Sequence, residues 1–336
     1  MLNGEFNFSK PYMSIILTAY NRKEFLKEAL ESIFDQKIDK TQFEIIVIKN
    51  FHDEVIDKLI QFNNVQMIIM EGTVGSYLLA GLEASKGEIL CFLDDDDKFL
   101  PNKLDSVVQI FRKNEDVIYY HNTVFYMDKY GHLINSTRRR QFLNPFIVNG
   151  NLLTKEDLIY ILKYSGDFNI SSISIKKSVL LRFKDILPKI TAHTDSFLFF
   201  CASSLNGHMY FDKEPLTYYR IHDSTSGIPQ ETQTYQSWAR VNYRDSINTY
   251  DLISSNIELK TGKERIYCRL TSSKLRYYFV TPDYQIEKES INKYIKCALA
   301  SGASYAIYSA LIIIWYILIK LFPKAGRIFY LAIRFP

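Results

Sequence analysis

The sequence predicts an α/β fold: a mostly parallel, Rossmann-like sheet with helices on both faces, followed by a mainly helical C-terminal region. Short apolar runs rich in β-branched residues recur in the N-terminal third, and stretches with helical spacing separate them. The strand-like runs are 13–18, 43–49, 65–70 and 88–93. The helical stretches are those near 53–62, 76–86 and 101–113, and one carrying Phe25, Leu26, Ala29, Leu30, Ile33 and Phe34 on one face. Strands that alternate with helices form a parallel sheet, and Asn21 with Glu24 predicts where the first helix starts.

Beyond about residue 117 the pattern changes. Shorter strand-like runs mix with helical stretches, which predicts an antiparallel or mixed edge of the sheet. These runs are 170–175, 208–212 and 216–221. A Gly-Ile-Pro interruption at 227–229 places a soft domain boundary near residue 228. The expected units are 1–228, 229–296 and 297–336.

The composition is that of a folded protein that does not bind nucleic acid. Apolar residues make up 47% and charged residues 23% of the chain, which excludes extensive disorder. Lysine and arginine number 41 against 37 acidic residues, but the surplus of four lies in the acid-free tail 320–336. The rest of the chain is formally neutral, whereas a nucleic-acid-binding domain would carry a basic face.

The cysteines predict neither a metal knuckle nor a disulfide framework. All four are far apart and show no CxxC spacing. We therefore expect buried, reduced thiols, consistent with a reducing cytosol. The first ten residues also lack the apolar core of a signal peptide, so the main body of the protein is expected in the cytosol. The cysteines are Cys91, Cys201, Cys268 and Cys297.

Residues 297–319 form an uncharged apolar segment that is long enough to cross a bilayer as a helix. With the main body in the cytosol, one crossing would carry the four tail cations outside, against the preference for cytosolic Lys and Arg. A helix that lies in the interface, followed by a basic amphipathic tail, avoids this conflict. A buried helix in a soluble core is the remaining alternative.

Four carboxylates follow the apolar run at 88–93 in the sequence FLDDDDKFLP. Adjacent carboxylates repel one another, and burial near a sheet raises that cost unless a cation balances the charge. Mg²⁺ or Mn²⁺ takes such oxygen ligands together with substrate phosphates. The alternative is an acidic helix start at Pro101, which we weigh equally for Asp97 but not for Asp94 and Asp96. Neutralisation of the acids by lysine and arginine would remove the argument.

Several segments together resemble glycosyltransferase family 2, with the GT-A fold. These segments are SIILTAYNR, the EIIVI run and VGSYLLAGLEASKGEILCFLDDDDKFLPNKL, which occur in the family's order and spacing. The resemblance covers residues 13 to about 113 strongly and reaches about 226 more weakly. It implies an enzyme of the hexosyltransferase class that moves a sugar from a nucleoside-diphosphate sugar to an acceptor hydroxyl. It also implies inversion at the anomeric carbon, through a single in-line displacement.

The resemblance also implies roles for individual residues. Thr18, Ala19 and Tyr20 match the loop that holds the base and ribose, and Arg22 the diphosphate contact. Asp94 and Asp95 match donor contacts, and Asp96 matches the ligand of a divalent cation, Mg²⁺ or Mn²⁺. Relatives commonly end the second strand with acids that read the base, but Lys49 and Asn50 stand here, so Asn50 becomes the expected base contact and Lys49 a solvated strand end.

Two further segments match parts of the family's site. In AHTDSFLFF, Asp195 matches the carboxylate that serves as general base toward the acceptor hydroxyl, although it also suits a helix N-cap. In YYRIHDSTS, His222 matches a histidine near the metal and diphosphate, with Arg220 as its charge partner. The basic triplet Arg138–Arg140 is expected in a solvated loop, with a phosphate-binding role as the alternative.

The acceptor and the location follow from the C-terminal segment. Membrane attachment suits an acceptor glycan that is itself lipid-linked, so we expect the enzyme at the cytoplasmic face of the cell membrane. Two other functions remain open on the sequence alone. One is a non-catalytic, membrane-tethered binder of sugar nucleotides; the other is a phosphotransferase of the haloacid-dehalogenase type, which also uses DxD after a strand.

Overall fold

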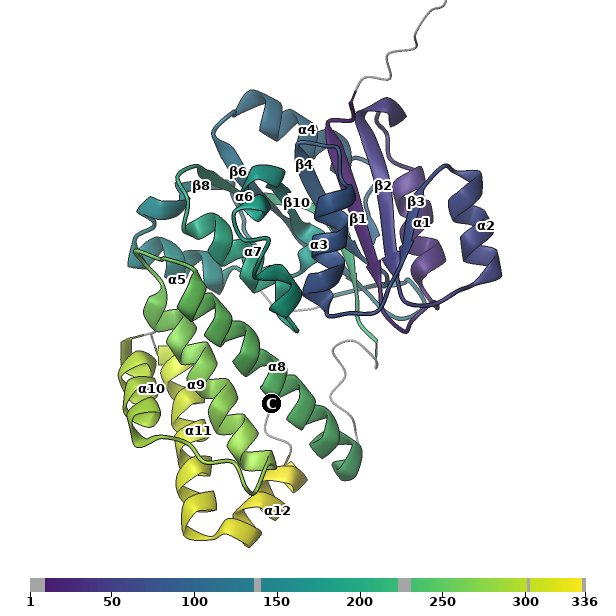
Figure 1. Ribbon diagram of the computed structural model, residues 1–336. Helices are drawn as coiled ribbons and strands as arrows, with labels where there is room; N and C mark the ends of the chain where they lie inside the picture. Colours follow the sequence, from purple (N-terminus) through teal and green to yellow (C-terminus); the bar gives the residue numbers. More distant parts are fainter. Residues whose placement is uncertain (1–9, 136–139, 223–230, 301–302, 334–336) are drawn as a thin grey trace, which may run out of the picture.

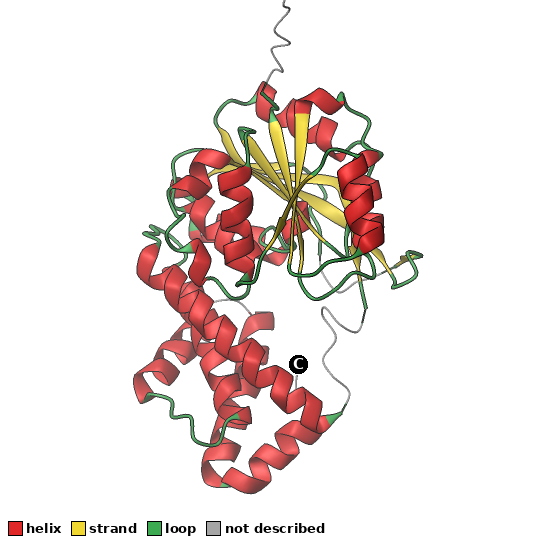
Figure 2. Ribbon diagram, turned by 45° about the vertical axis from the view of Figure 1, so that its right-hand side comes forward, coloured by secondary structure: helices red, strands yellow, loops and turns green. Residues whose placement is uncertain are grey.

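The computed structural model describes residues 10–135, 140–222, 231–300 and 303–333. Its centre is one ten-stranded sheet with the main order β3-β2-β1-β4-β9-β6-β10-β5, to which β7 adds beside β6 and β8 beside β10 (Figures 1 and 2). The strands are β1 (Met13–Ala19), β2 (Phe43–Lys49), β3 (Gln66–Ile69), β4 (Ile89–Asp94), β5 (Lys98–Phe99), β6 (Val117–Met127), β7 (Leu133–Ile134), β8 (Phe146–Asn149), β9 (Ile173–Lys176) and β10 (His208–Arg220).

The first four strands in this order are parallel, as the alternation of strands and helices predicts. Beyond β4 the sheet is mixed, because β9 enters antiparallel between β4 and β6. A mostly parallel sheet was therefore wrong as a description of the whole, and the expected mixed edge takes up more than half of it. The two runs 208–212 and 216–221 form one strand, β10, with register shifts around Pro215.

Helices cover both faces of the sheet (Figure 2). Alternate residues of β1 separate the two cores: Ile15 and Leu17 face α1, α2 and α4, whereas Ile16 faces α3 and α7. The helices of this region are α1 (Leu26–Phe34), α2 (Glu54–Phe62), α3 (Val74–Ala84), α4 (Lys103–Lys113), α5 (Lys155–Lys163), α6 (Lys177–Leu181) and α7 (Thr194–Ser203).

The expected start of the first helix near Asn21 was wrong. Helix α1 begins at Leu26, and Asn21 has a φ of 52°, a left-handed conformation that cannot continue into a right-handed helix. The Asn21 side chain and main chain are both hydrogen-bonded to Asn50 on the neighbouring strand end. This residue therefore shapes the loop after β1 instead of capping a helix.

Helix α3 approaches the segment 187–190 so closely that Gly75 leaves no room for a side chain. Its N–H donates to the Ile190 carbonyl (3.0 Å), and a Cβ would lie 1.9 Å from the Leu187 carbonyl oxygen. Gly75→Ala should therefore destabilise the fold by about 2 kcal/mol or more, although helix propensity alone favours alanine by about 1 kcal/mol. Urea denaturation measures this change, and an unchanged or raised midpoint would contradict the close approach.

A helical region follows the sheet and packs below it in the view of Figure 1. Its buried side chains form one core that all five helices share, with Tyr235, Phe279, Tyr294, Ile319 and Tyr330 among them. The expected boundary near 228 lies outside the described residues. The helices are α8 (Thr232–Asn256), α9 (Lys263–Val280), α10 (Lys288–Ala300), α11 (Ala303–Leu321) and α12 (Pro323–Ile333).

Two C-terminal expectations change. Cys268 of α9 and Cys297 of α10 are paired as a disulfide, with their Cα atoms 6.0 Å apart, so four reduced thiols were wrong; Cys91 and Cys201 are free and buried. The antiparallel packing of two helices brings these cysteines together across 29 residues of sequence. Among the described helices, none combines the length and the apolar character that a membrane crossing requires. The expected span 297–319 is divided between α10 and α11.

Candidate active site

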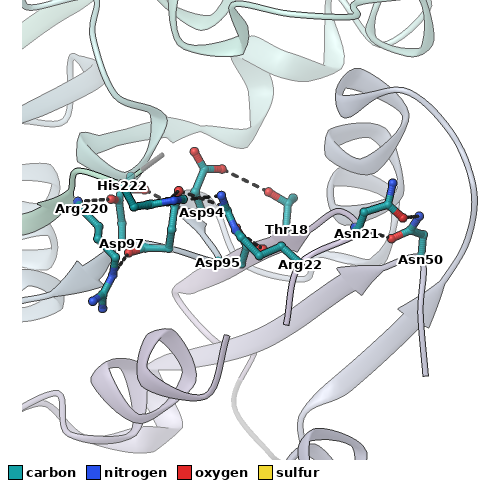
Figure 3. Close-up of polar contacts among 11 residues, drawn as sticks. Thr18, Asn21, Arg22, Asn50, Asp94, Asp95, Asp97, Arg220 and His222 are labelled. Atoms are coloured by element: carbon teal, nitrogen blue, oxygen red, sulfur yellow. Dashed lines mark hydrogen bonds and ion pairs between the residues drawn. The ribbon is translucent and has the colours of Figure 1, made fainter. Parts of the chain in front are cut away.

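The four carboxylates lie at the carboxyl end of β4, next to the end of β1 (Figure 3). We call residues Asp94–Asp97 the acidic turn. The Asp95 N–H donates to the Thr18 carbonyl (3.2 Å), and the Thr18 hydroxyl lies 3.3 Å from Asp94 Oδ1. The Ser171 hydroxyl accepts the Asp94 N–H at 3.0 Å. Parallel strand ends thus bring the acids and the loop after β1 to one edge of the sheet, as the sequence predicts.

The acidic turn crowds four carboxyl groups into a largely buried environment. Oxygen atoms of Asp94, Asp96 and Asp97 all lie within 4.8 Å of one another. Burial, and then the neighbouring carboxylates, raise the pKa of Asp94 well above its ordinary value and that of Asp97 to about 8. Burial raises the pKa of Asp95 to about 6, although Arg22 opposes this shift. Such a group of oxygen ligands, held close together at high cost, can take up a cation.

Part of this charge is already compensated within the chain. Arg22 forms a two-point ion pair with Asp95 and places Nη2 at 2.8 Å from Asp96 Oδ2. His222 Nε2 lies 2.9 Å from the same Asp96 oxygen. Within the described residues, no lysine or arginine forms an ion pair with Asp94 or Asp97. Basic side chains therefore already neutralise Asp95 and Asp96, whereas no described lysine or arginine is paired with Asp94 or Asp97. The argument for a cation still applies to these two acids.

Arg220 holds the acidic turn in its shape through several contacts. It is fully buried, its Nε donates to the Asp96 carbonyl (2.8 Å), and its main-chain N–H donates to Asp97 Oδ1 (3.0 Å). Its Nη2 pairs with Glu28 at 2.9 Å, and the guanidinium lies over the Phe25 ring. From the sequence, Arg220 was expected to be the charge partner of His222. The contacts of Arg220 show instead that it holds the main chain of the acidic turn.

Asn169 joins the acidic turn to Asp195. Its side-chain amide donates to Asp97 Oδ2 (3.0 Å), and its main-chain N–H donates to Asp195 Oδ2 (3.1 Å). Asp195 lies in the first turn of α7 after His193, which occupies the N-cap position, so the N-cap alternative was wrong. Burial raises the pKa of Asp195. A carboxylate suited to proton transfer thus shares one hydrogen-bonded unit with the acidic turn.

The helical region supplies contacts behind Asp195 that the sequence did not reveal. Arg269 of α9 pairs with Asp167 (2.6 Å) and donates to the Ser196 hydroxyl (2.8 Å). His193 Nε2 lies 2.7 Å from the Ser246 hydroxyl of α8. No local pattern marks these residues, because each acts across 50 or more positions of the chain. Asn169, in DFNIS, carries no motif either.

The expected nucleotide-binding residues lie at two strand ends: Ala19 and Tyr20 at the end of β1, and Asn50 directly after β2. Tyr20 is exposed, with its ring edge-on to Tyr77, whereas the Ala19 methyl group packs in the core. Asn50 is hydrogen-bonded to Asn21 (2.8 Å) and lies 3.4 Å from both carboxylate oxygens of Glu71. An acid therefore reaches the end of β2 from the loop after β3, a residue that the sequence pattern did not single out.

Lys49 does not belong with the expected nucleotide-binding residues. Lys49 was expected to be solvated, but it is fully buried, and its Nζ bonds to Asp57 (2.5 Å) and to the Phe51 carbonyl (2.6 Å). It therefore pins the loop after β2 and is not available to a ligand. Of the triplet, Arg138 and Arg139 lie outside the described residues, and Arg140 is exposed.

The raised pKa of Asp97 predicts a pH-dependent difference between the wild type and Asp97→Asn. Between its ordinary pKa and about 8, the folded protein binds this proton more than the unfolded chain does, so the residue's contribution to stability falls as pH rises. The unfolding free energy of Asp97→Asn minus that of the wild type should therefore increase from pH 5 to pH 8. Urea denaturation in EDTA measures it.

The variant also loses the hydrogen bond from Asn169, but that loss is a constant offset, so the slope with pH carries the test. Glu156→Gln, which removes an exposed carboxylate from α5, controls for the change of net charge. A flat difference for Asp97→Asn across this range would show that Asp97 is ionised in the folded protein despite its burial.

Two solved glycosyltransferase structures resemble this fold. Residues 1–349 of S. aureus TarS in complex with UDP align with a TM-score of 0.54 and 14% identity, over 85% of this chain and 80% of that chain. The mannosyltransferase PcManGT from Pyrobaculum calidifontis, in complex with GDP-Man and Mn²⁺, aligns with a TM-score of 0.51 and 13% identity, over 97% of this chain and 87% of that one. At these identities the likeness shows the fold alone, which is GT-A-like.

Sequence comparisons identify the family. An uncharacterized glycosyltransferase of Haemophilus influenzae is 29% identical over 230 residues, which cover 67% of this chain and 73% of the relative. One from Nostoc is 25% identical over 246 residues, 68% of this chain and 70% of the relative. The model of glycosyl transferase family 2 matches residues 14–180, which include all of β1 except Met13, and the acidic turn. The chain therefore belongs to glycosyltransferase family 2 and is a glycosyltransferase.

Proposed function

We propose that this enzyme transfers a sugar from a nucleoside-diphosphate sugar to an acceptor hydroxyl, with a divalent cation and with inversion at the anomeric carbon. The observation that carries this proposal is the Asn169 bridge, which joins Asp97 and Asp195 through two hydrogen bonds of 3.0 and 3.1 Å. The carboxylate cluster, which can hold a cation for an anionic donor, and the candidate base thereby belong to one site. In-line displacement needs these two functions on opposite sides of the sugar.

The donor side is assigned to the ends of β1, β2 and β4. Thr18, Ala19 and Tyr20 would border the nucleoside, with the exposed Tyr20 ring offering a stacking surface and Ala19 its main chain. Asn50, fixed by Asn21 and Glu71, would contact the base. Asp94 and Asp95 would contact the sugar and ribose side of the donor. Arg22, whose fork geometry suits phosphate as well as carboxylate, would bind the diphosphate.

The residues present fit a hard divalent cation. Mg²⁺ and Mn²⁺ prefer oxygen ligands and keep open positions for phosphate oxygens. Asp96 and His222 are assigned as its ligands, because Asp96 belongs to the cluster of three close carboxylates and His222 Nε2 lies 2.9 Å from its Oδ2. A bound cation would supply positive charge beside the leaving diphosphate. Arg22 would then be released from Asp96 toward the phosphates.

Asp195 is assigned as the general base. Its carboxylate takes the proton of the acceptor hydroxyl while the hydroxyl oxygen forms a bond to the anomeric carbon. The bond from that carbon to the diphosphate oxygen breaks, and its electron pair leaves with the nucleoside diphosphate. The raised pKa of Asp195 supports this role, because a carboxylate whose pKa lies above its ordinary value is a stronger base once it is ionised.

The acceptor is proposed to be a glycan, including one carried on a lipid, and the reaction to take place at the cytoplasmic face of the cell membrane. Support comes from the C-terminal stretch 290–336, which contains six lysine and arginine residues and no acid. Cationic segments of this kind are attracted to the anionic cytoplasmic leaflet.

A thermal-shift screen tests the donor and the cation together. UDP-, GDP- and dTDP-sugars are added singly, each with and without Mn²⁺. A donor that binds the folded state raises the midpoint by mass action, and the proposal requires that Mn²⁺ enlarge this shift. The Asp96→Asn variant is the matched control and should lose the Mn²⁺-dependent part. A donor shift of equal size in EDTA would contradict metal dependence, without affecting the assignment of Asp195.

A further inference from the structure

Helix α11 turns an apolar face outward. Leu311, Ile314, Leu318 and Leu321 follow one another at intervals of three, four and three residues, which places them on one side of the helix, and all four are exposed. The opposite side supplies the buried contacts: Ile312 and Ile319 are fully buried in the core shared with α8 and α9. The helix therefore has two apolar faces, and the fold covers only one of them.

Helix α12 continues the same feature. Phe322 at the turn and Ile328, Phe329 and Ile333 on the helix are each more than 60% exposed. Tyr330 on the other side is buried against Trp315 of α11 (ring centroids 5.5 Å apart). We call these two helices the apolar hairpin; α12 and the turn that joins it to α11 lie at the end of the helical region away from the sheet (Figure 1). An exposed apolar area of this extent marks an interaction surface.

The charges that the apolar hairpin itself carries all have one sign. From residue 290 to the end, the sequence contains six lysine and arginine residues and no aspartate or glutamate. Lys320 and Lys324 flank the turn between the helices and are exposed, next to Leu321 and Phe322. A segment that exposes an apolar face and has only cations among its own charged residues is complementary to a surface with anionic groups above an apolar layer.

We propose that the apolar hairpin binds an anionic membrane surface, with its exposed aliphatic and aromatic side chains in the headgroup and acyl boundary and its cations at the phosphates. A second copy of the chain is a poorer fit, because two such faces would bring like charges together. The inference does not rest on the proposed transfer reaction, because it involves neither the donor nor Asp195.

Vesicle co-sedimentation of the full chain tests the proposal. Vesicles of phosphatidylcholine with phosphatidylglycerol are compared with pure phosphatidylcholine, without donor or metal. The wild type should bind the anionic vesicles, and its affinity for them should fall as the salt concentration is raised. Leu321→Ser with Phe329→Ser removes side chains that are 65% and 63% exposed, and should weaken binding at least tenfold. Val55→Ser with Phe62→Ser, at 66% and 87% exposure on α2, is the matched control and should bind as the wild type does.

A second pair of variants tests the charge. Each cation near an anionic leaflet strengthens binding about fivefold, so Lys320→Gln with Lys324→Gln should weaken it roughly 30-fold. Lys37→Gln with Lys113→Gln, both exposed on the catalytic domain, should have no such effect. Thermal unfolding confirms that each variant is folded. Equal vesicle binding by Leu321→Ser/Phe329→Ser and the wild type would overturn the proposal. So would a wild-type dimer that this variant converts to a monomer, with no binding to either vesicle.

Discussion

Asp96→Asn is expected to reduce kcat/KM roughly a thousandfold, since several kcal/mol of charge stabilisation at the diphosphate depends on it. Its Oδ2 is the point where Arg22 Nη2 (2.8 Å) and His222 Nε2 (2.9 Å) converge. Asparagine keeps the shape of the side chain but has no charge, so it cannot hold a cation against the competing guanidinium. The fold should survive, because Arg22 keeps its two-point contact with Asp95.

The measurement is the initial rate of transfer as a function of Mn²⁺ concentration. The variant should need far more metal than the wild type and should not reach its rate at saturation. Asp105→Asn, on the helix that follows the turn and outside the cluster, is the control and should titrate as the wild type does. Normal turnover of Asp96→Asn at the wild-type metal concentration would mean that the cation, if used, is held by Asp94 and Asp97 instead.

Local pattern was sufficient for the parts of the molecule whose contacts are near in sequence or set by strand periodicity. The run ending at Leu93 had to be a buried strand, and the acids after it had to emerge at its carboxyl end. Thr18 ends the neighbouring strand, so its contact with Asp94 follows from a parallel register. These two strand ends also lie within the segment that the family model matches.

Long-range compensation could not be read in the same way. In the sequence, Arg220 has no feature that distinguishes it from other strand residues. Only the fold brings its guanidinium to the Asp96 carbonyl, 124 positions away. Lys49 at a strand end suggests solvent, but a partly exposed carboxylate partner, Asp57, makes burial of Lys49 possible. Cys268 and Cys297 have no diagnostic spacing, and only helix packing pairs them. In each case the partner, not the residue itself, decides the role.

The apolar segment 297–319 illustrates a related limit. Its composition satisfies the length rule for a bilayer crossing, yet the chain divides it between two helices and buries Ile312 and Ile319 against its own core. Hydropathy averages the inward and outward faces of a helix, so it cannot separate a span from a helix that packs on one side and exposes apolar residues on the other. That separation requires the burial of each residue.

Asp195→Asn is expected to lower kcat by about 10²- to 10⁴-fold, the range of general-base catalysis, with little change in donor affinity. Asn169 separates Asp195 from the acidic turn, so the donor-side contacts remain in place. Asparagine retains one acceptor oxygen for the two N–H groups, of Asn169 and Ser196, that Asp195 accepts. One lost hydrogen bond costs about 1–3 kcal/mol of stability, and thermal unfolding with and without donor separates that cost from the loss of the base.

The pH profile distinguishes a base from a residue that only shapes the site. Asp195 acts as a base when ionised, so the wild-type rate should rise with pH as the carboxylate deprotonates, and its raised pKa moves this limb toward neutrality. The residual activity of Asp195→Asn should lack the limb, whereas Asp195→Glu, which restores a carboxylate at a displaced position, should recover the limb at a reduced rate. If Asp195→Asn kept the wild-type limb, another group would be taking the proton, and the role of Asp195 would be limited to holding Asn169 and the first turn of α7.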